Sequence, residues 1–105
     1  MNRFIDQTCR RLACALLATA SAHATAQVGM SQVSLGSLPV TLSYPTPAIA
    51  SPVTLGAFEL NVAMDAPAKD GRHRLVVISH GTGGSAVADH ALVSKLVHAG
   101  FVVAQ

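Results

Sequence analysis

The fold of this chain is decided by the segment LVVISHGTGGS at residues 75–85. Its first part, residues 75–78, is uniformly apolar, which is typical of a strand covered on both faces. Three glycines within residues 81–84 follow directly, and they allow the backbone to bend sharply and to approach a ligand closely. Consecutive backbone N–H groups in such a turn, next to a helix N-terminus, favour an anion. The segment therefore predicts an α/β fold with an anion-facing turn.

A helix is predicted over residues 86–99, directly after the glycine-rich turn. Ser85 is a candidate N-cap, because its hydroxyl can accept a hydrogen bond from the first helical turn. Four apolar residues follow the i, i+3, i+4 spacing and would form one stripe that packs on a sheet: Leu92, Val93, Leu96 and Val97. Polar residues are expected on the opposite, solvated face: His90, Ser94, Lys95 and His98.

The end of this helix is marked by Gly100, since glycine readily adopts the left-handed conformation that follows a helical C-terminus. Residues 101–104 are again apolar and predict a second buried strand. Strand, helix and strand within about 30 residues form a right-handed βαβ unit. A parallel sheet that begins in this way would also have an unpaired edge.

Shorter strands, separated by proline and glycine, are predicted before residue 75. Residues 28–35 and 39–44 mix β-branched and polar side chains, with Gly36 and Ser37 between them as a turn. This pattern predicts an antiparallel hairpin. The fold class is therefore α/β, with an N-terminal antiparallel hairpin that leads into the first βαβ unit of a sheet.

The stretch between the hairpin and the βαβ unit is predicted to be less regular. Three prolines keep residues 45–52 extended and irregular, because each proline fixes φ and removes an N–H donor. Residues 53–62 regain strand character around Phe58 and Leu60. Residues 65–74 are polar and predict a connector.

Residues 1–26 have the pattern of a cleaved secretory signal peptide. A positively charged start precedes an apolar run at residues 12–20, and small residues follow at 22–26. Cleavage after Ala26 fits best, and cleavage after Ala24 is the neighbouring alternative. The apolar run is much shorter than the ~20 residues that span a bilayer, so no stable membrane anchor is expected. We therefore expect export to a bacterial periplasm or to the medium, with residues 27–105 forming the mature chain.

Charge and cysteine content exclude several classes of function. Without residues 1–26 the chain has four basic and four acidic residues, so it is close to neutral. It has no basic stripe with interleaved aromatic residues, and nucleic acid is therefore not an expected partner. Both cysteines, Cys9 and Cys14, lie in the signal segment. The mature chain thus has no disulfide, no thiol nucleophile and no cysteine-based metal site.

The glycine-rich turn and its flanks resemble a known family. SHGTGGS at residues 79–85, then a helix, then GFVVA at residues 100–104, resembles the secreted dienelactone-hydrolase-like and platelet-activating-factor-acetylhydrolase-like branch of the α/β-hydrolases. VTLSYPT at residues 40–46 also looks like the early strand of that branch, which ends in Tyr-Pro. The resemblance covers residues 28–104 and corresponds to the first third of the family's domain.

The resemblance implies a function and a set of site residues. The backbone N–H groups of Thr82 and Gly83 would stabilise the oxyanion of a carboxylic ester or lactone substrate, while His80 and Gly81 would shape the loop. The family's G-x-S-x-G elbow, its acid and its late histidine have no counterpart in this sequence. The chain is therefore expected to be an incomplete N-terminal portion of a hydrolase domain and to be inactive alone. The resemblance implies no metal and no organic cofactor.

Two alternatives stay open. Gly81-x-Gly83-x-x-Ala86 also satisfies the G-x-G-x-x-G/A pattern of a dinucleotide-binding fold, although strand-like segments precede it and no acidic residue follows the second strand. The other alternative is a non-catalytic remnant of a hydrolase. His90 and His98 share a helix face, but no carboxylate or cysteine accompanies them, so a solvated polar face is favoured over a metal site.

Overall fold

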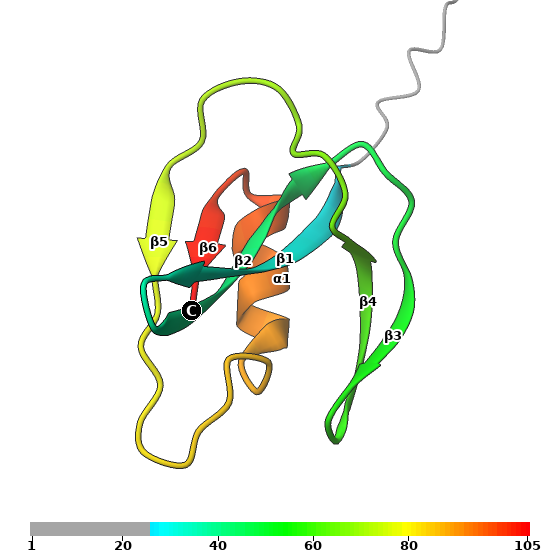
Figure 1. The fold of residues 1–105 in the computed structure, drawn as a ribbon. Helices are drawn as coiled ribbons and strands as arrows, with labels where there is room; N and C mark the ends of the chain where they lie inside the picture. Colours follow the sequence, from blue (N-terminus) through cyan, green and yellow to red (C-terminus); the bar gives the residue numbers. More distant parts are fainter. Residues whose placement is uncertain (1–25) are drawn as a thin grey trace, which may run out of the picture.

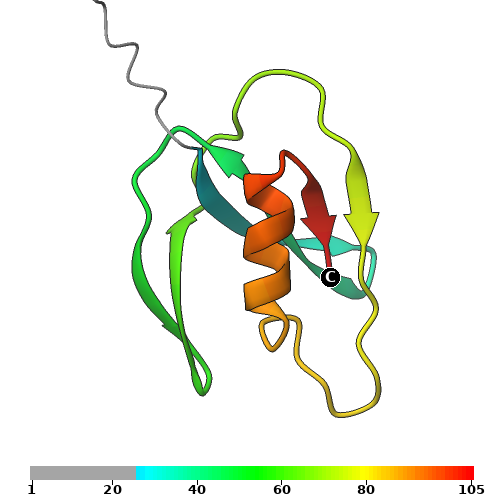
Figure 2. The same ribbon diagram turned by 180° about the vertical axis from the view of Figure 1, so that it is seen from behind.

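The computed structural model of the protein describes residues 26–105, in which one helix packs on a six-stranded mixed sheet (Figures 1 and 2). The strand order is β3-β4-β1-β2-β6-β5. This arrangement confirms the α/β class. The predicted signal segment lies outside the described residues, except for Ala26. The elements are β1 Gln27–Leu35, β2 Leu38–Thr46, β3 Ser51–Leu55, β4 Phe58–Met64, β5 Leu75–Val77, α1 His90–His98 and β6 Val102–Ala104.

The first two strands pair antiparallel over their whole length, from Gln27 opposite Thr46 to Leu35 opposite Leu38. The turn between them contains Gly36 with φ of 63°, a left-handed conformation that glycine adopts at low cost. β2 continues two residues beyond the predicted end at Tyr44, and its far side pairs with β6. The β1–β2 pair therefore forms the centre of the sheet.

The stretch before the connector contains two strands instead of the single one that was predicted over residues 53–62. β3 and β4 pair antiparallel around a turn at Gly56, and β4 then runs parallel to β1. β3 begins at Ser51, inside the stretch whose prolines predicted irregular structure. Pro52 is tolerated there because β3 is an outer strand, in which a missing N–H need not break a ladder.

The predicted βαβ unit is present as β5, α1 and β6. β5 and β6 run parallel, from Leu75 opposite Val102 to Val77 opposite Ala104. The helix is shorter than predicted, because residues 86–89 form turns in place of a first helical turn. Its end is as predicted: Gly100 has φ of 97°, and the N–H of Phe101 donates to the Leu96 carbonyl at 3.0 Å.

The face that α1 turns to the sheet differs from the predicted stripe. Val93 and Val97 are fully buried against the sheet, but Leu92 is 52% exposed. His90, predicted on the solvated face, is half-buried. Positions 90, 93 and 97 follow the i, i+3, i+7 spacing of one helix face, so they line up on the inner side of α1. The buried stripe is therefore narrower than predicted and has a histidine at its N-terminal end.

The core lies between α1 and one face of the sheet. Each fully buried valine contributes about 1.5 kcal/mol or more relative to an exposed one. The fully or nearly fully buried members come from three strands (β1, β4 and β6) and the helix: Val28, Met30, Leu60, Val62, Val93, Val97 and Val103.

The opposite face of the sheet has no helix on it among the described residues (Figure 1). The prediction that residues 75–78 are covered on both faces is therefore wrong for the described part of the chain. Leu75 is 60% and Val77 71% exposed. Among residues 26–105, no element covers the face of the sheet that carries Leu75 and Val77, and β5 is the outermost strand with β6 as its single neighbour. The predicted unpaired edge is thus present and lies along β5.

Tyr44 explains why β1 contains a glycine. A Cβ added at Gly29 would lie 2.4 Å from Cε2 of the Tyr44 ring. The ring cannot easily move away, because the Tyr44 hydroxyl donates to the Ala66 carbonyl at 2.5 Å and lies 2.8 Å from Ser31 Oγ. The ring is also buried. Position 29 therefore accepts only glycine without rearrangement.

We predict that Gly29→Ala destabilises the protein by about 1–3 kcal/mol, the usual cost of overpacking a buried site. Urea unfolding followed by circular dichroism measures the loss. Gly81→Ala is the matched control, because a Cβ at Gly81 would meet nothing within 4 Å; it should stay within about 0.5 kcal/mol of the parent. Equal losses for the two variants would contradict the steric explanation.

Candidate functional site

The glycine-rich segment lies where parallel strands of a sheet end. β5 and β6 point the same way, and residues 79–89 leave the carboxyl end of β5 beside the carboxyl end of β6 (Figures 1 and 2). In open α/β sheets, ligands bind outside the carboxyl ends of the strands. The Ile78 N–H donates to the Ala104 carbonyl at 2.8 Å, so the chain is hydrogen-bonded to the sheet up to Ile78. The segment at residues 79–89 begins directly after it, with the exposed Ser79. The position agrees with the predicted ligand-facing turn.

The turn itself is closed by one backbone hydrogen bond. The Gly84 N–H donates to the Gly81 carbonyl at 2.9 Å, and Gly83 between them has φ of 79°, as the third residue of a type II turn does. Gly84 has little room for a side chain, because an added Cβ would lie 3.0 Å from the Gly81 oxygen. The backbone shape therefore depends on these glycines, whether or not a ligand binds.

Three N–H groups of the turn at residues 81–84 have no partner among the described residues, and Thr82 and Gly83 supply two of them. Within residues 26–105, the amides of Thr82 and Gly83 make no hydrogen bond, whereas the Gly84 amide is used to close the turn. All three residues are exposed. The structure thus leaves free the two donors that the sequence singled out.

His80 lies directly before the turn and is exposed, with Nδ1 3.2 Å from the Gly81 carbonyl oxygen. It lines two hollows. The first, the loop hollow, has a volume of about 330 Å³ and is lined in part by Gln32, Thr41, Ala86 and Gln105. The second, the apolar hollow, has a volume of about 500 Å³ and is lined largely by aliphatic side chains: Leu35, Leu38, Val40, Leu75, Val77 and Ile78.

The helix does not support the turn as predicted. Ser85 is not the N-cap; its Oγ accepts a hydrogen bond from the Val87 N–H at 3.3 Å within the turn at residues 86–89. The N-cap is Asp89, whose side chain makes no capping hydrogen bond. The positive end of the helix dipole acts only within about one turn of the helix terminus, so it contributes little at Thr82.

The late start of α1, four residues after the predicted one, also bears on the dinucleotide alternative. In that fold the glycine pattern opens the helix, and the pyrophosphate sits at the helix N-terminus. Here Ala86, the last position of the pattern, lies in the turn that precedes α1. The described geometry therefore lacks the feature that gives this glycine pattern its affinity for a pyrophosphate.

The histidines on α1 do not form a metal site with each other in the structure. Nδ1 of His98 lies 3.4 Å from Ser94 Oγ on the exposed side, whereas Nδ1 of His90 is buried without a partner. Burial lowers the pKa of His90 below its ordinary value of 6.5. No group of three or more metal-ligating side chains occurs among the described residues.

His73 has a role that its position in the polar connector did not predict. Its Nδ1 lies 3.1 Å from the Gly100 carbonyl oxygen, and its Nε2 lies 3.1 Å from the Lys69 carbonyl oxygen. The ring therefore joins the connector to the segment between α1 and β6. No sequence pattern predicts that a histidine ring will contact two backbone carbonyl oxygens.

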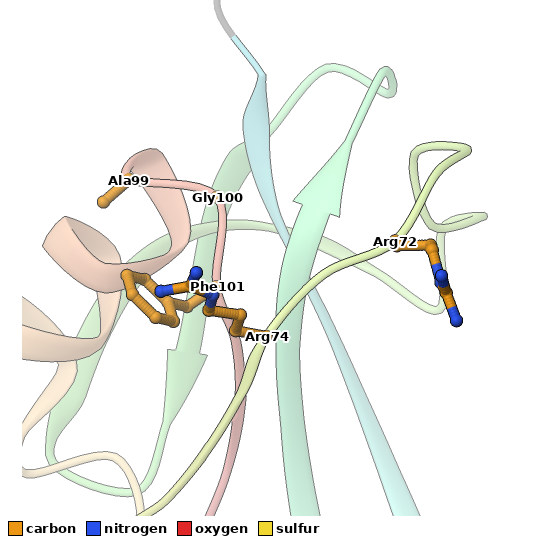
Figure 3. Close-up of a pocket in the computed structure, with 5 residues that line it drawn as sticks. All are labelled: Arg72, Arg74, Ala99, Gly100 and Phe101. Atoms are coloured by element: carbon orange, nitrogen blue, oxygen red, sulfur yellow. The ribbon is translucent and has the colours of Figure 1, made fainter.

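A further hollow of about 260 Å³ lies at the other end of β5 and β6, away from the glycine turn. Figure 3 shows that the Arg74 side chain lies beside the Phe101 ring, whereas Arg72 points away from it. The remaining lining residues are Ala99 and Gly100. The two guanidinium groups do not converge, so this hollow offers no built anion site.

Comparison of the chain with protein-family models, with curated proteins and with solved structures finds no match in any of the three. Among the residues that the structure describes, no helix is long and apolar enough to cross a membrane. Any function therefore has to be argued from the glycine turn and its surroundings.

The position of Ser85 gives a test of the local structure. We predict that Ser85→Ala changes the free energy of unfolding by less than about 0.5 kcal/mol, because the residue is exposed and four positions before the N-cap, Asp89. Loss of a true N-cap typically costs about 1 kcal/mol. Urea unfolding of the variant distinguishes the two, and a loss of about 1 kcal/mol or more would mean that the helix begins at Ser85.

Proposed function

We propose that this chain is the N-terminal portion of an exported serine-type hydrolase that cleaves carboxylic esters or lactones. The observation that carries the proposal is the pair of unbonded amides at Thr82 and Gly83, at the carboxyl end of β5. Preorganised N–H donors in such a place stabilise the negative oxygen that develops during acyl transfer. The resemblance of residues 79–85 and 100–104 to the dienelactone-hydrolase-like branch supports the same reaction.

The proposal requires a second part of the site. In α/β-hydrolases the other oxyanion donor is the N–H of the residue after the nucleophile, which sits in a G-x-S-x-G elbow at the end of a strand. Both donors must lie about 3 Å from one oxygen, so the strand that carries the elbow has to end beside the glycine turn. β6 occupies the inner side of β5, and the outer edge of β5 is free in residues 26–105. That edge is the position at which the nucleophile strand fits.

The chemistry follows from these parts. In the complete enzyme a serine attacks the carbonyl carbon, a histidine takes the serine proton, and an acid orients the histidine. The Thr82 and Gly83 amides hold the resulting oxyanion. His80 and Gly81 set the path of the backbone into the turn, and neither carries a proton in the reaction. The ester or lactone is a small molecule, and the reaction requires no metal or organic cofactor.

The first test is activity. We predict that the 105-residue chain does not hydrolyse p-nitrophenyl acetate, whereas a protein encoded by an open reading frame that continues into a G-x-S-x-G elbow does. In that longer protein, Thr82→Pro removes one donor and should lower kcat by about 10²–10³-fold. Thr82→Ala keeps the N–H and should lose far less.

Three outcomes would overturn the proposal. Hydrolysis by the 105-residue chain above its Thr82→Pro variant would mean that residues 1–105 hold a complete active site and need no later elbow. A genomic stop directly after codon 105 would make the chain a non-catalytic remnant. An acidic residue directly after β6, without a later elbow, would favour the dinucleotide-binding alternative.

Export is the second part of the proposal. We predict that the protein recovered from the periplasm or the medium begins at Gln27, or at Thr25 if the neighbouring cleavage site is used. β1 begins at Gln27, so cleavage after Ala26 removes no residue of the sheet. Intact-mass measurement of the exported chain identifies its first residue. A cytoplasmic protein that keeps Met1 would contradict export.

A further inference from the structure

His90 occupies an unusual position for a histidine on a surface helix. It is the first residue of α1, in line with the fully buried Val93 and Val97. Its Nδ1 is completely buried and has no hydrogen-bond partner, whereas Nε2 is not among the buried unpartnered atoms. The ring is therefore partly buried at the start of α1, with its two nitrogens in different environments.

The surroundings of His90 contain nothing that would compensate a positive charge. α1 packs mainly on β1, β2 and β6, and the only ionisable side chain in these strands is that of Tyr44. β4 shares the core cluster with α1 and carries Glu59, which is exposed and, as the neighbour of the inward-facing Leu60, lies on the opposite face of its strand. Tyr44 lies on the other face of the sheet, where its hydroxyl is bound to Ala66. On α1 itself the charged or titratable residues are Lys95 and His98, which are basic. Asp89, the nearest carboxylate in sequence, is exposed and makes no capping hydrogen bond.

The loop that precedes the helix adds no compensation either. Its titratable side chain is that of His80, which is exposed and lies beside the Gly81 carbonyl. The N-terminal end of a helix carries a partial positive charge, so a cation at its first residue is disfavoured. An imidazolium at position 90 would thus meet unfavourable charge, and in the docked geometry its Nδ1 has no acceptor within hydrogen-bonding distance.

The two nitrogens decide what a proton would do. In the neutral ring, one nitrogen carries the proton. Nε2, which is accessible to solvent, is the favourable place because water can accept a hydrogen bond from it. A second proton must then go to Nδ1. This creates a buried N–H without an acceptor, which is costly unless the ring leaves its site.

From this geometry we propose that protonation of His90 in mildly acidic solution releases the start of α1 from the sheet and loosens the glycine turn with it. The inference goes beyond the proposed hydrolysis, since it concerns the folding of the described chain and holds with or without activity. Residues 79–89 connect directly to His90, so release of the first helical turn frees the backbone on which Thr82 and Gly83 lie. The device is an acid-sensitive latch.

The loss of docking at low pH agrees with the direction in which burial shifts the pKa of His90. Burial lowers the pKa of His90, so the released state binds protons at a higher pH than the docked state does. The docked state is therefore fully favoured above the ordinary histidine pKa and loses stability as the pH falls below it.

Amide hydrogen exchange of the full chain, followed by NMR between pH 7.5 and 5 and corrected for intrinsic exchange, tests the latch. The Val93 N–H, which donates to the Asp89 carbonyl at 3.0 Å, should lose protection by about fivefold or more at the lower pH, the factor expected for one unpartnered buried N–H. The amides of the β1–β2 pair should keep theirs. His90→Leu should abolish the loss, while His98→Gln, which removes an exposed histidine from the same helix, should retain it.

Three results would overturn the proposal: no loss in the parent protein, the same loss in His90→Leu, or a uniform loss across helix and sheet. If His90→Leu does not fold, ¹⁵N imidazole shifts of the parent protein decide instead. The latch requires the Nε2–H tautomer at pH 7.5 and a His90 titration midpoint below that of the same residue in urea. A midpoint equal to that in urea would contradict it.

Discussion

Two backbone hydrogen bonds hold together the parts of this protein that are far apart in sequence. The Thr41 N–H donates to the Gln105 carbonyl at 2.8 Å, and the Gln105 N–H donates to the Thr41 carbonyl at 2.9 Å. Together with the pairing of Ser43 and Val103, they fix β6 against β2. Because β5 reaches the sheet only through β6, the position of the glycine turn relative to the β1–β2 pair depends on this junction. The loop hollow, which Thr41, His80 and Gln105 share, exists for the same reason.

The sequence was informative where local chemistry decides the structure. The glycine pattern located the turn, and Gly100 located the end of the helix, because in both places the backbone adopts a left-handed conformation that favours glycine. The apolar runs around them identified the parallel strands. The roles of Thr82 and Gly83 were implied by the family resemblance and stay a prediction; the structure adds that their amides are unbonded.

Features that depend on distant neighbours could not be predicted in this way. An apolar run such as residues 75–78 is compatible with burial on both faces, but exposure of Leu75 and Val77 follows from the place of β5 in the sheet. The start of α1 was misplaced because the Ser85 pattern is satisfied equally well by a turn. The error at His90 has another cause: the spacing of His90, Val93 and Val97 (i, i+3, i+7) places it on the inner side, and the predicted exposure followed only from its polarity.

The connector between β4 and β5 has a mechanical consequence. It passes over one end of the sheet (Figure 1). Three hydrogen bonds to backbone carbonyls hold it there: the Asp65 N–H donates to the Met30 carbonyl, the Lys69 N–H to the Pro45 carbonyl, and the Thr46 hydroxyl to the Pro67 carbonyl. His73 then joins it to the carbonyl after the helix. Because it is anchored at these points, the connector forms a rigid link between the central strands and β5. The start of β5 is thereby held close to the central strands, while at its other end the glycine turn is restrained by its own closing hydrogen bond and by the segment that leads into α1.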